Sequence, residues 1–180
     1  LKWAIYHSEI PIDYITFGGD GEPTLYSGLG RVIRWIRLTF GKRYRVAVLT
    51  NGSLLWRRDV IEDLKEADVV LPSMDAVDEA MFQRINHPHP ELSFDKVLSG
   101  IKDFSRRFHG QIWLEIMLLN GLNDDDKTLR RFAEIVSDIV PQRTYINVPI
   151  RPPANQRAVR PPVARVRRAL ELIPGAMSLN

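Results

Sequence analysis

The stretch YITFGGDGEPTLY, residues 14 to 26, decides the fold of this chain, because an apolar run passes directly into a glycine-rich turn. Residues Tyr14 to Phe17 have strand character, and the glycines that follow allow the backbone to turn tightly or to approach a ligand closely. Pro23 fixes the exit from the turn. Asp20 and Glu22 supply two carboxylates that could face a cation such as an ammonium group, and an ordinary turn with solvated acids is the alternative.

Apolar runs of the same kind recur along the chain and alternate with helical patterns. The five strand-like runs are Tyr14 to Phe17, Tyr44 to Thr50, Asp68 to Leu71, Ile112 to Leu119 and Thr144 to Ile150. The helical patterns lie at 29–36, with Ser27 as the N-cap and Gly41 past the end, and at 59–65, 77–85, 94–108, 129–140 and 163–172. This alternation predicts an α/β fold with a parallel sheet or barrel, and the nearly continuous apolar runs are typical of strands buried on both faces.

Length and composition limit the class of protein. A chain of 180 residues that is 44% hydrophobic suits one domain, or part of a larger one, with a real core. No apolar run is long enough to span a membrane and no signal pattern opens the chain, so we expect a cytoplasmic protein without a membrane partner. The absence of cysteine excludes disulfides, cysteine nucleophiles and thiolate-bound metal sites built from these residues alone.

Polar residues stand where the later strands end, and loops at such ends form the ligand site of parallel βα architectures. Asn51 follows the second strand, where an ordinary turn is the alternative. Ser73 and Asp75 follow the third strand, where they could hold a diol such as a ribose or could cap the next helix. Glu115 lies within an apolar strand, so it needs a ligand or an ion-pair partner.

Two other motifs are less specific. The sequence NHPHP at 86–90 has two histidines but lacks a third metal ligand nearby, which favours a structural or substrate-facing loop over a zinc site. The segment from 151 to 180 combines a proline-rich connector with a short basic helix, and it would follow the main unit formed by residues 1 to 150. Six arginines between Arg151 and Arg168, without an acid among them, form either a solvated surface or a phosphate contact.

Taken in order, five segments resemble the radical S-adenosylmethionine (SAM) superfamily, and most closely its wyosine-base-synthase-like branch of iron–sulfur oxidoreductases. They are YITFGGDGEPTLY at 14–26, VLTNGSLL at 48–55, DVVLPSMDAVDEAMFQRINHPHP at 68–90, IWLEIMLLNGLND at 112–124 and YINVPIRPPA at 145–154. GDGEP is a specific form of the family's glycine-glycine-glutamate motif, whereas each of the other segments is weak alone. The resemblance implies a partial (β/α)6 TIM-like barrel with its first βα unit missing.

The resemblance also implies a cofactor site. Residues Gly19, Asp20, Gly21 and Glu22 would meet the methionine amino group of SAM, although Asp20 stands where many relatives have glycine. The other positions that the resemblance brings to the cofactor are Asn51, Ser73, Asp75, Glu115, Met117 and Asn147. Ser73 and Asp75 would face the ribose or the methionine carboxylate.

Family members reduce SAM through a 4Fe-4S cluster held by three cysteines in a CxxxCxxC loop, and this chain has no cysteine. The resemblance therefore implies part of a radical SAM enzyme that generates a 5′-deoxyadenosyl radical for hydrogen abstraction, with an electron donor as partner. We expect this chain alone to be inactive. Branch resemblance and the arginines point to tRNA base modification, with tRNA or another nucleic acid bound through Arg151 to Arg168. The alternative is a cluster-free barrel that binds a nucleotide or tRNA without radical chemistry.

Overall fold

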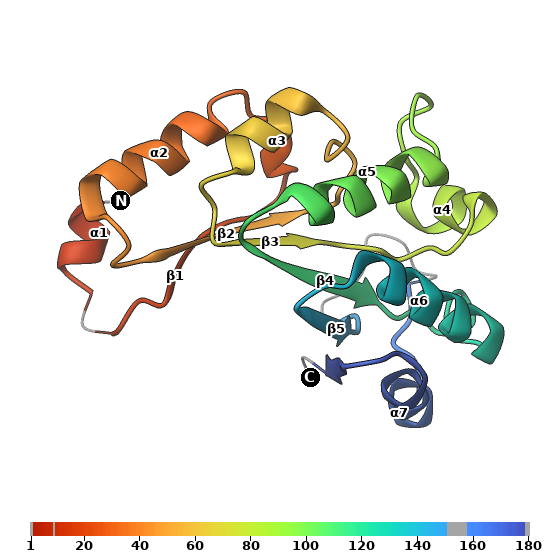
Figure 1. Ribbon diagram of the computed structural model, residues 1–180. Helices are drawn as coiled ribbons and strands as arrows, with labels where there is room; N and C mark the ends of the chain where they lie inside the picture. Colours follow the sequence, from red (N-terminus) through yellow and green to blue (C-terminus); the bar gives the residue numbers. More distant parts are fainter. Residues whose placement is uncertain (1, 9, 151–157, 179–180) are drawn as a thin grey trace.

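The computed structural model describes residues 2–8, 10–150 and 158–178, and within them six parallel strands form one sheet (Figure 1). The strands are β1 (Tyr14–Phe17), β2 (Arg45–Thr50), β3 (Val69–Pro72), β4 (Gln111–Met117), β5 (Arg143–Asn147) and β6 (Ala176–Ser178). The helices are α1 (Lys2–Tyr6), the 3-10 helix η1 (Pro23–Leu25), α2 (Leu29–Phe40), α3 (Arg58–Leu64), α4 (Glu79–Asn86), α5 (Phe94–Arg107), α6 (Asp126–Ile139) and α7 (Val163–Leu172).

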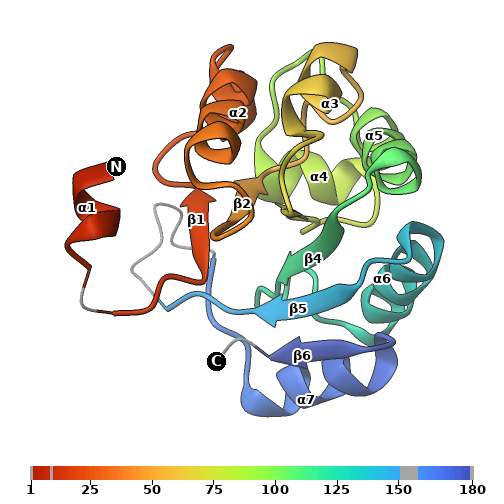
Figure 2. The same ribbon diagram turned by 60° about the vertical axis from the view of Figure 1, so that its left-hand side comes forward.

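The strands follow one another across the sheet in chain order, from β1 to β6. Each crossover therefore connects neighbours, and all carboxyl ends of the strands meet along one edge of the sheet. The sheet curves, with helices α2 to α7 on its convex side and α1 apart from them beside β1 (Figure 2). This arrangement confirms the α/β barrel-like fold expected from the sequence.

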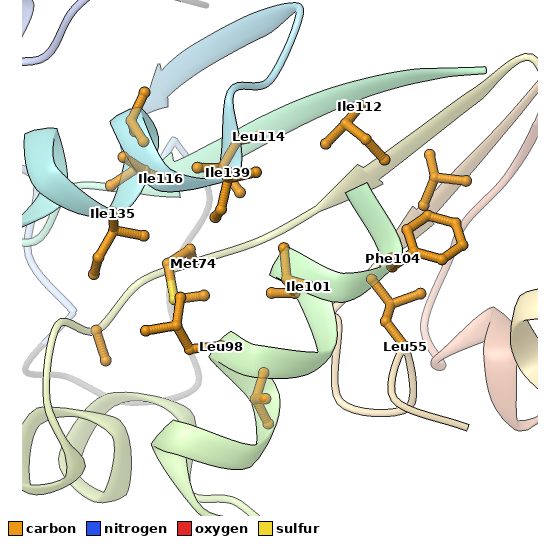
Figure 3. Close-up of a cluster of buried hydrophobic side chains, with 14 of the residues drawn as sticks. Leu55, Met74, Leu98, Ile101, Phe104, Ile112, Leu114, Ile116, Ile135 and Ile139 are labelled. Carbon is orange, nitrogen blue, oxygen red and sulfur yellow. The ribbon is translucent and has the colours of Figure 1, made fainter. Parts of the chain in front are cut away.

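The core lies between the convex face of the sheet and the helices. In β4, Ile112, Leu114 and Ile116 are almost fully buried and belong to one apolar cluster with side chains of α5 and α6 (Figure 3). The amphipathic spacing of these two helices supplies the opposite wall, for example Ile101 and Ile135.

The concave face differs from the expectation that strands are buried on both sides. In β4, burial alternates, because Trp113, Glu115 and Met117 on this face are only partly buried. Leu49 of β2 is 39% exposed on the same face. The reason is that none of the described helices covers this side of the sheet (Figure 2).

Two sequence predictions were wrong in detail. A sixth strand, β6, was not predicted, because three residues with little β-propensity carry no pattern until they pair with β5. Helix α2 is preceded by Gly28 rather than by Ser27 as the N-cap, although Gly41 ends it with a positive φ of 60° as expected. The predicted helix at 163–172 coincides with α7.

Helix α7 packs against α6 through ion pairs that join distant parts of the sequence. Arg165 and Arg168 both contact the carboxylate of Asp126, at 3.0 and 2.9 Å. Arg165 also donates to the backbone oxygen of Asp124. The basic segment itself contains no acid, and these two arginines pair with an acid at the start of α6. No helix in the described part of the chain is both long enough and apolar enough to cross a membrane.

Candidate functional site

A cavity of about 410 Å³ opens at the carboxyl ends of β1 to β4. Seven of the residues predicted for the site line it, and they come from four separate segments of the sequence. These residues are Gly19, Asp20, Gly21, Glu22, Asn51, Ser73 and Glu115. The remaining walls include Leu49, Thr50 and Leu71. The cavity lies on the concave face, and we refer to it as the acidic cavity.

Glu22 joins the glycine-rich loop to the end of β2. Its Oε1 atom accepts hydrogen bonds from the backbone nitrogen and the hydroxyl of Thr24, at 3.0 and 2.6 Å, and from the hydroxyl of Thr50 at 2.6 Å. Its Oε2 atom accepts one bond, from the backbone nitrogen of Asn51 at 2.7 Å. The carboxylate is therefore held rigidly at the cavity wall, and Oε2 keeps lone-pair capacity for a ligand.

The loop before Glu22 needs glycine at one position. Gly19 has a φ of 148°, which side-chain-bearing residues rarely adopt, and an added Cβ there would meet no atom within 4 Å. Backbone conformation rather than space therefore requires glycine. This turn places the exposed carboxylate of Asp20 at the mouth of the acidic cavity.

The end of β2 is both a turn and a part of the cavity wall. The side chain of Asn51 accepts from the backbone nitrogen of Ser53 at 2.9 Å, which is the ordinary turn considered as the alternative for this segment. Thr50 accepts from the backbone nitrogen of Gly52 at 3.1 Å while donating to Glu22. Sequence reasoning missed Thr50 and Thr24 as the groups that hold Glu22, because a threonine at a strand end carries no specific signal.

Glu115 is placed by the pairing of β3 and β4. Its backbone oxygen accepts from the nitrogen of Met74 at 2.8 Å, just where Ser73 forms an isolated bridge with it. Its Oε1 atom accepts from the side-chain nitrogen of Asn147 on β5 at 2.9 Å. Glu115 thus has a neutral partner, and its negative charge remains available to the acidic cavity.

Asp75 is not among the residues that line the acidic cavity, and its expected place beside Glu22 at the cofactor stays a prediction. Its carboxylate accepts from the backbone nitrogen of Met117 at 2.9 Å and from the side chain of Asn86 at 3.4 Å. Burial raises its pKa to about 6, and the nearby charge of Glu115 adds to the shift, against the two hydrogen bonds. The carboxyl group therefore ties β4 to the loop after β3.

Met117 and Asn147 also lie outside the cavity lining. The backbone of Met117 binds Asp75, and its carbonyl accepts from the side chain of Asn123, which is completely buried. Asn147 donates to Glu115, which lines the cavity. Met117 and Asn147 therefore contact groups around the acidic cavity, and their role at the cofactor stays a prediction.

Charge is the clearest chemical feature of the acidic cavity. Among the described residues, its lining includes three carboxylates, from Asp20, Glu22 and Glu115, and no lysine, arginine or histidine. Such a site favours a ligand that carries positive charge. Among the described residues, no group of three or more histidines and acids is arranged to hold a metal ion.

Comparisons with known proteins concern the family and the fold of this chain. The sequence profile of the Radical SAM superfamily matches residues 1–133. The chain is 41% identical over 158 residues to a protein named GTPase Obg from Brachyspira hyodysenteriae, covering 88% of this chain and 23% of that protein. It is 36% identical over 155 residues to a UPF0026 protein from Methanocaldococcus jannaschii, covering 86% and 47%.

Among solved structures, the fold is similar to a domain of pyruvate-formate lyase-activating enzyme from Bacteroides vulgatus, with a TM-score of 0.73. The sequence identity is 16%, and the match covers 93% of this chain and 99% of that one, so the likeness concerns the fold. The chain spans between about a quarter and a half of the length of the two curated relatives.

Proposed function

This chain belongs to the radical SAM superfamily, and we propose that its acidic cavity binds S-adenosylmethionine. The observation that carries the proposal is a lining that has three carboxylates and, among the described residues, no basic side chain. SAM has an ammonium group and a sulfonium group against a single carboxylate, so its net charge complements this lining. A nucleotide with only phosphate charge would be repelled by the same cavity.

The residues of the cavity divide by chemistry. The Oε2 atom of Glu22 and the carboxylate of Asp20 would accept hydrogen bonds from the ligand's ammonium group. The hydroxyl of Ser73 and the amide of Asn51 are the polar groups suited to the methionine carboxylate or a ribose hydroxyl. Leu49 and Leu71 offer apolar surface to the uncharged parts of the ligand.

SAM, bound with a reduced iron–sulfur cluster, supplies radical chemistry that removes a hydrogen atom from a substrate. A cluster does not fit the residues of this chain, which has no cysteine to hold it. The task assigned to these residues is therefore to bind and orient SAM. The expectation that the chain alone is inactive stays a prediction, and cluster-free binding is the corresponding alternative function.

Binding of SAM to the purified chain, measured by isothermal titration calorimetry, tests the proposal. Asp20→Asn is the variant of choice, because Asp20 is exposed and its loss of charge leaves the contacts of Glu22 in place. We expect affinity to fall about fivefold to tenfold, since one charge contact at a partly exposed site contributes about 1 kcal/mol. Glu62→Gln on α3 is the matched control, because Glu62 lies outside the acidic cavity.

S-adenosylhomocysteine, which lacks the sulfonium charge, provides the second arm of this test. It should bind more weakly than SAM to the unaltered chain, and Asp20→Asn should weaken both ligands by a similar factor, because both carry the ammonium group assigned to Asp20. Equal affinities for the two ligands in both proteins would contradict the electrostatic basis of the proposal.

Binding of a nucleic acid, including tRNA as a substrate for base modification, remains a proposal. Fewer arginines are free to support it than the sequence indicated. Arg165 and Arg168 are engaged with Asp126, and Arg151 and Arg157 lie outside the described residues. Arg160 and Arg167 are exposed and form no ion pair within the described part of the chain. These two are the groups through which phosphate contact is best tested.

A further inference from the structure

A second cavity, of about 550 Å³, adjoins the acidic cavity. It lies between the turn after β2 and the connection from α4 to α5, and Asn51 lines both cavities. Its size falls within the range of roughly 300 to 1,000 Å³ that small-molecule sites have. We refer to it as the basic cavity, because its described lining includes Lys96, two histidines and Arg57, which is paired with Asp59, beside the acid Glu91.

The walls of the basic cavity are largely apolar. Leu25, Leu54, Phe82 and Leu92 come from four separate segments and enclose it together with Trp56. Leu25 and Trp56 are 72% and 42% exposed, so part of their apolar surface is accessible to a ligand. The cavity therefore suits a ligand with a flat, uncharged body.

Lys96 provides an ammonium group without a carboxylate partner among the described residues. Its Nζ atom lies 3.9 Å from the centre of the Trp56 ring, and it reaches the backbone oxygen of Glu91 only at 3.5 Å. The side chain is half-buried, so its charge has lost part of its water. An ammonium group held in this way attracts an anionic oxygen.

The NHPHP loop adds a hydrogen-bond donor. The Nδ1 atom of His89 is 3.3 Å from the backbone nitrogen of Glu91, which donates to it, so a neutral His89 carries its proton on Nε2. His87 ends α4 with a φ of 45°, and Pro88 and Pro90 restrict the chain beyond it. The loop is thus restrained and presents its imidazoles to the cavity.

We infer that the basic cavity binds a nucleotide, with its phosphate at Lys96 and His89 and its base against the apolar walls. The amides of Asn51 and Asn86 and the carboxylate of Glu91 can pair with the polar edge of a base or with ribose hydroxyls. The inference depends on the lining of this cavity and not on SAM binding. The nucleotide could be free or part of an RNA chain, since both present the same phosphate and base.

The test measures binding of adenosine monophosphate, adenosine and a short single-stranded RNA oligonucleotide to the full chain by calorimetry. Lys96→Met removes the charge but keeps an unbranched stem near Trp56, and we expect it to weaken monophosphate binding about tenfold while changing adenosine binding little. Lys42→Met, an exposed lysine outside the cavity, is the matched control. Tight binding of the oligonucleotide and weak binding of the monophosphate would identify the RNA source, and the reverse result the free one.

Asp20→Asn separates this inference from the proposed SAM site. If the monophosphate binds in the basic cavity, this variant leaves its affinity unchanged, whereas Lys96→Met leaves the affinity for SAM unchanged. The opposite result is a monophosphate affinity that rises in Asp20→Asn and does not change in Lys96→Met. It would place the nucleotide in the acidic cavity and overturn the inference. If the chain binds SAM but neither the monophosphate nor the oligonucleotide, the nucleotide inference is wrong and the proposed SAM site still stands.

Discussion

The two ends of the concave sheet face are built from the same strands but have opposite chemistry. At the carboxyl ends, Glu115 of β4 lines an acidic cavity together with loop residues. Two residues earlier on the same strand and face, Trp113 lies among aromatic and arginine side chains. The difference shows that position along a strand, more than the strand itself, decides whether a side chain meets a ligand or a neighbour.

At the amino ends of the strands, aromatic and arginine side chains form a layer in which they contact one another. Tyr14, Trp113 and Tyr145 form a row of edge-to-face contacts, with ring centres 5.8 and 6.0 Å apart. Arg45 and Arg143 donate to the hydroxyls of Tyr14 and Tyr145 at 3.2 and 3.1 Å, and Arg143 lies 4.5 Å from the centre of the Trp113 ring. These contacts use the cations and rings internally, so we assign this end to stability.

The largest expected effect comes from Trp113→Ala. The change removes the central ring of the layer, and because Trp113 is only partly buried we expect a loss of about 2 to 3 kcal/mol in the free energy of unfolding. Urea unfolding monitored by circular dichroism measures it. The affinity for SAM of the folded variant should stay within about twofold of the original, and a tenfold loss would show that the two ends are not separate in function.

Asp75→Asn tests a carboxyl group that stands at the carboxyl edge but outside the acidic cavity. The pKa of Asp75 is raised to about 6 from 3.8, so the native state holds its proton more tightly than the unfolded state does. This group therefore stabilises the fold below pH 4, and that contribution is lost as pH rises through 6. Because the pKa values of the two states are 3.8 and about 6, the loss in the free energy of unfolding is at most about 3 kcal/mol.

The asparagine variant lacks this titration. Its stability relative to the original chain should improve between pH 4 and pH 7.5 by up to about 3 kcal/mol, as measured by urea unfolding at both values. Its affinity for SAM should change little, since the contacts of Asp75 are with Met117 and Asn86. A parallel pH dependence in the two proteins would show that the carboxyl group is not buried as described.

Glu115→Gln should weaken SAM binding and leave the free energy of unfolding nearly unchanged, which is the opposite of the result expected for Trp113→Ala. The amide oxygen can still accept from Asn147, so stability should change by less than about 1 kcal/mol. The loss of one of three negative charges should weaken SAM binding about tenfold in calorimetry. A large loss of stability with unchanged affinity would assign Glu115 to the supporting structure instead.

The same contrast explains what the sequence could predict. Helix and strand positions were predictable from apolar periodicity, and the glycine-rich turn indicated the carboxyl-end loop before any coordinates. The hydrogen bonds of Asp75 were not predictable, because it follows β3 just as Ser73 does and its partner Met117 comes from a distant part of the sequence. Contacts between distant segments, such as Arg165 with Asp126, leave no local pattern either.

The smallest expected effect concerns cations outside the acidic cavity at the carboxyl end. Val159, next to Arg160, accepts from the backbone nitrogen of Asn120 in the loop after β4 at 2.9 Å, so Arg160 lies near the edge at which the cavity opens. Arg160→Ala combined with Arg167→Ala removes two exposed charges and keeps the ion pairs of Arg165 and Arg168. We expect tRNA binding to weaken severalfold, with a salt dependence shallower by at most about two phosphate contacts.

Filter retention across a salt series measures both the affinity and its salt dependence. The control is Arg31→Ala combined with Arg34→Ala on the exposed face of α2. If the two double variants have equal affinities and salt slopes, charge near the cavity does not guide nucleic acid, and the contrast between the two ends concerns only the concave face.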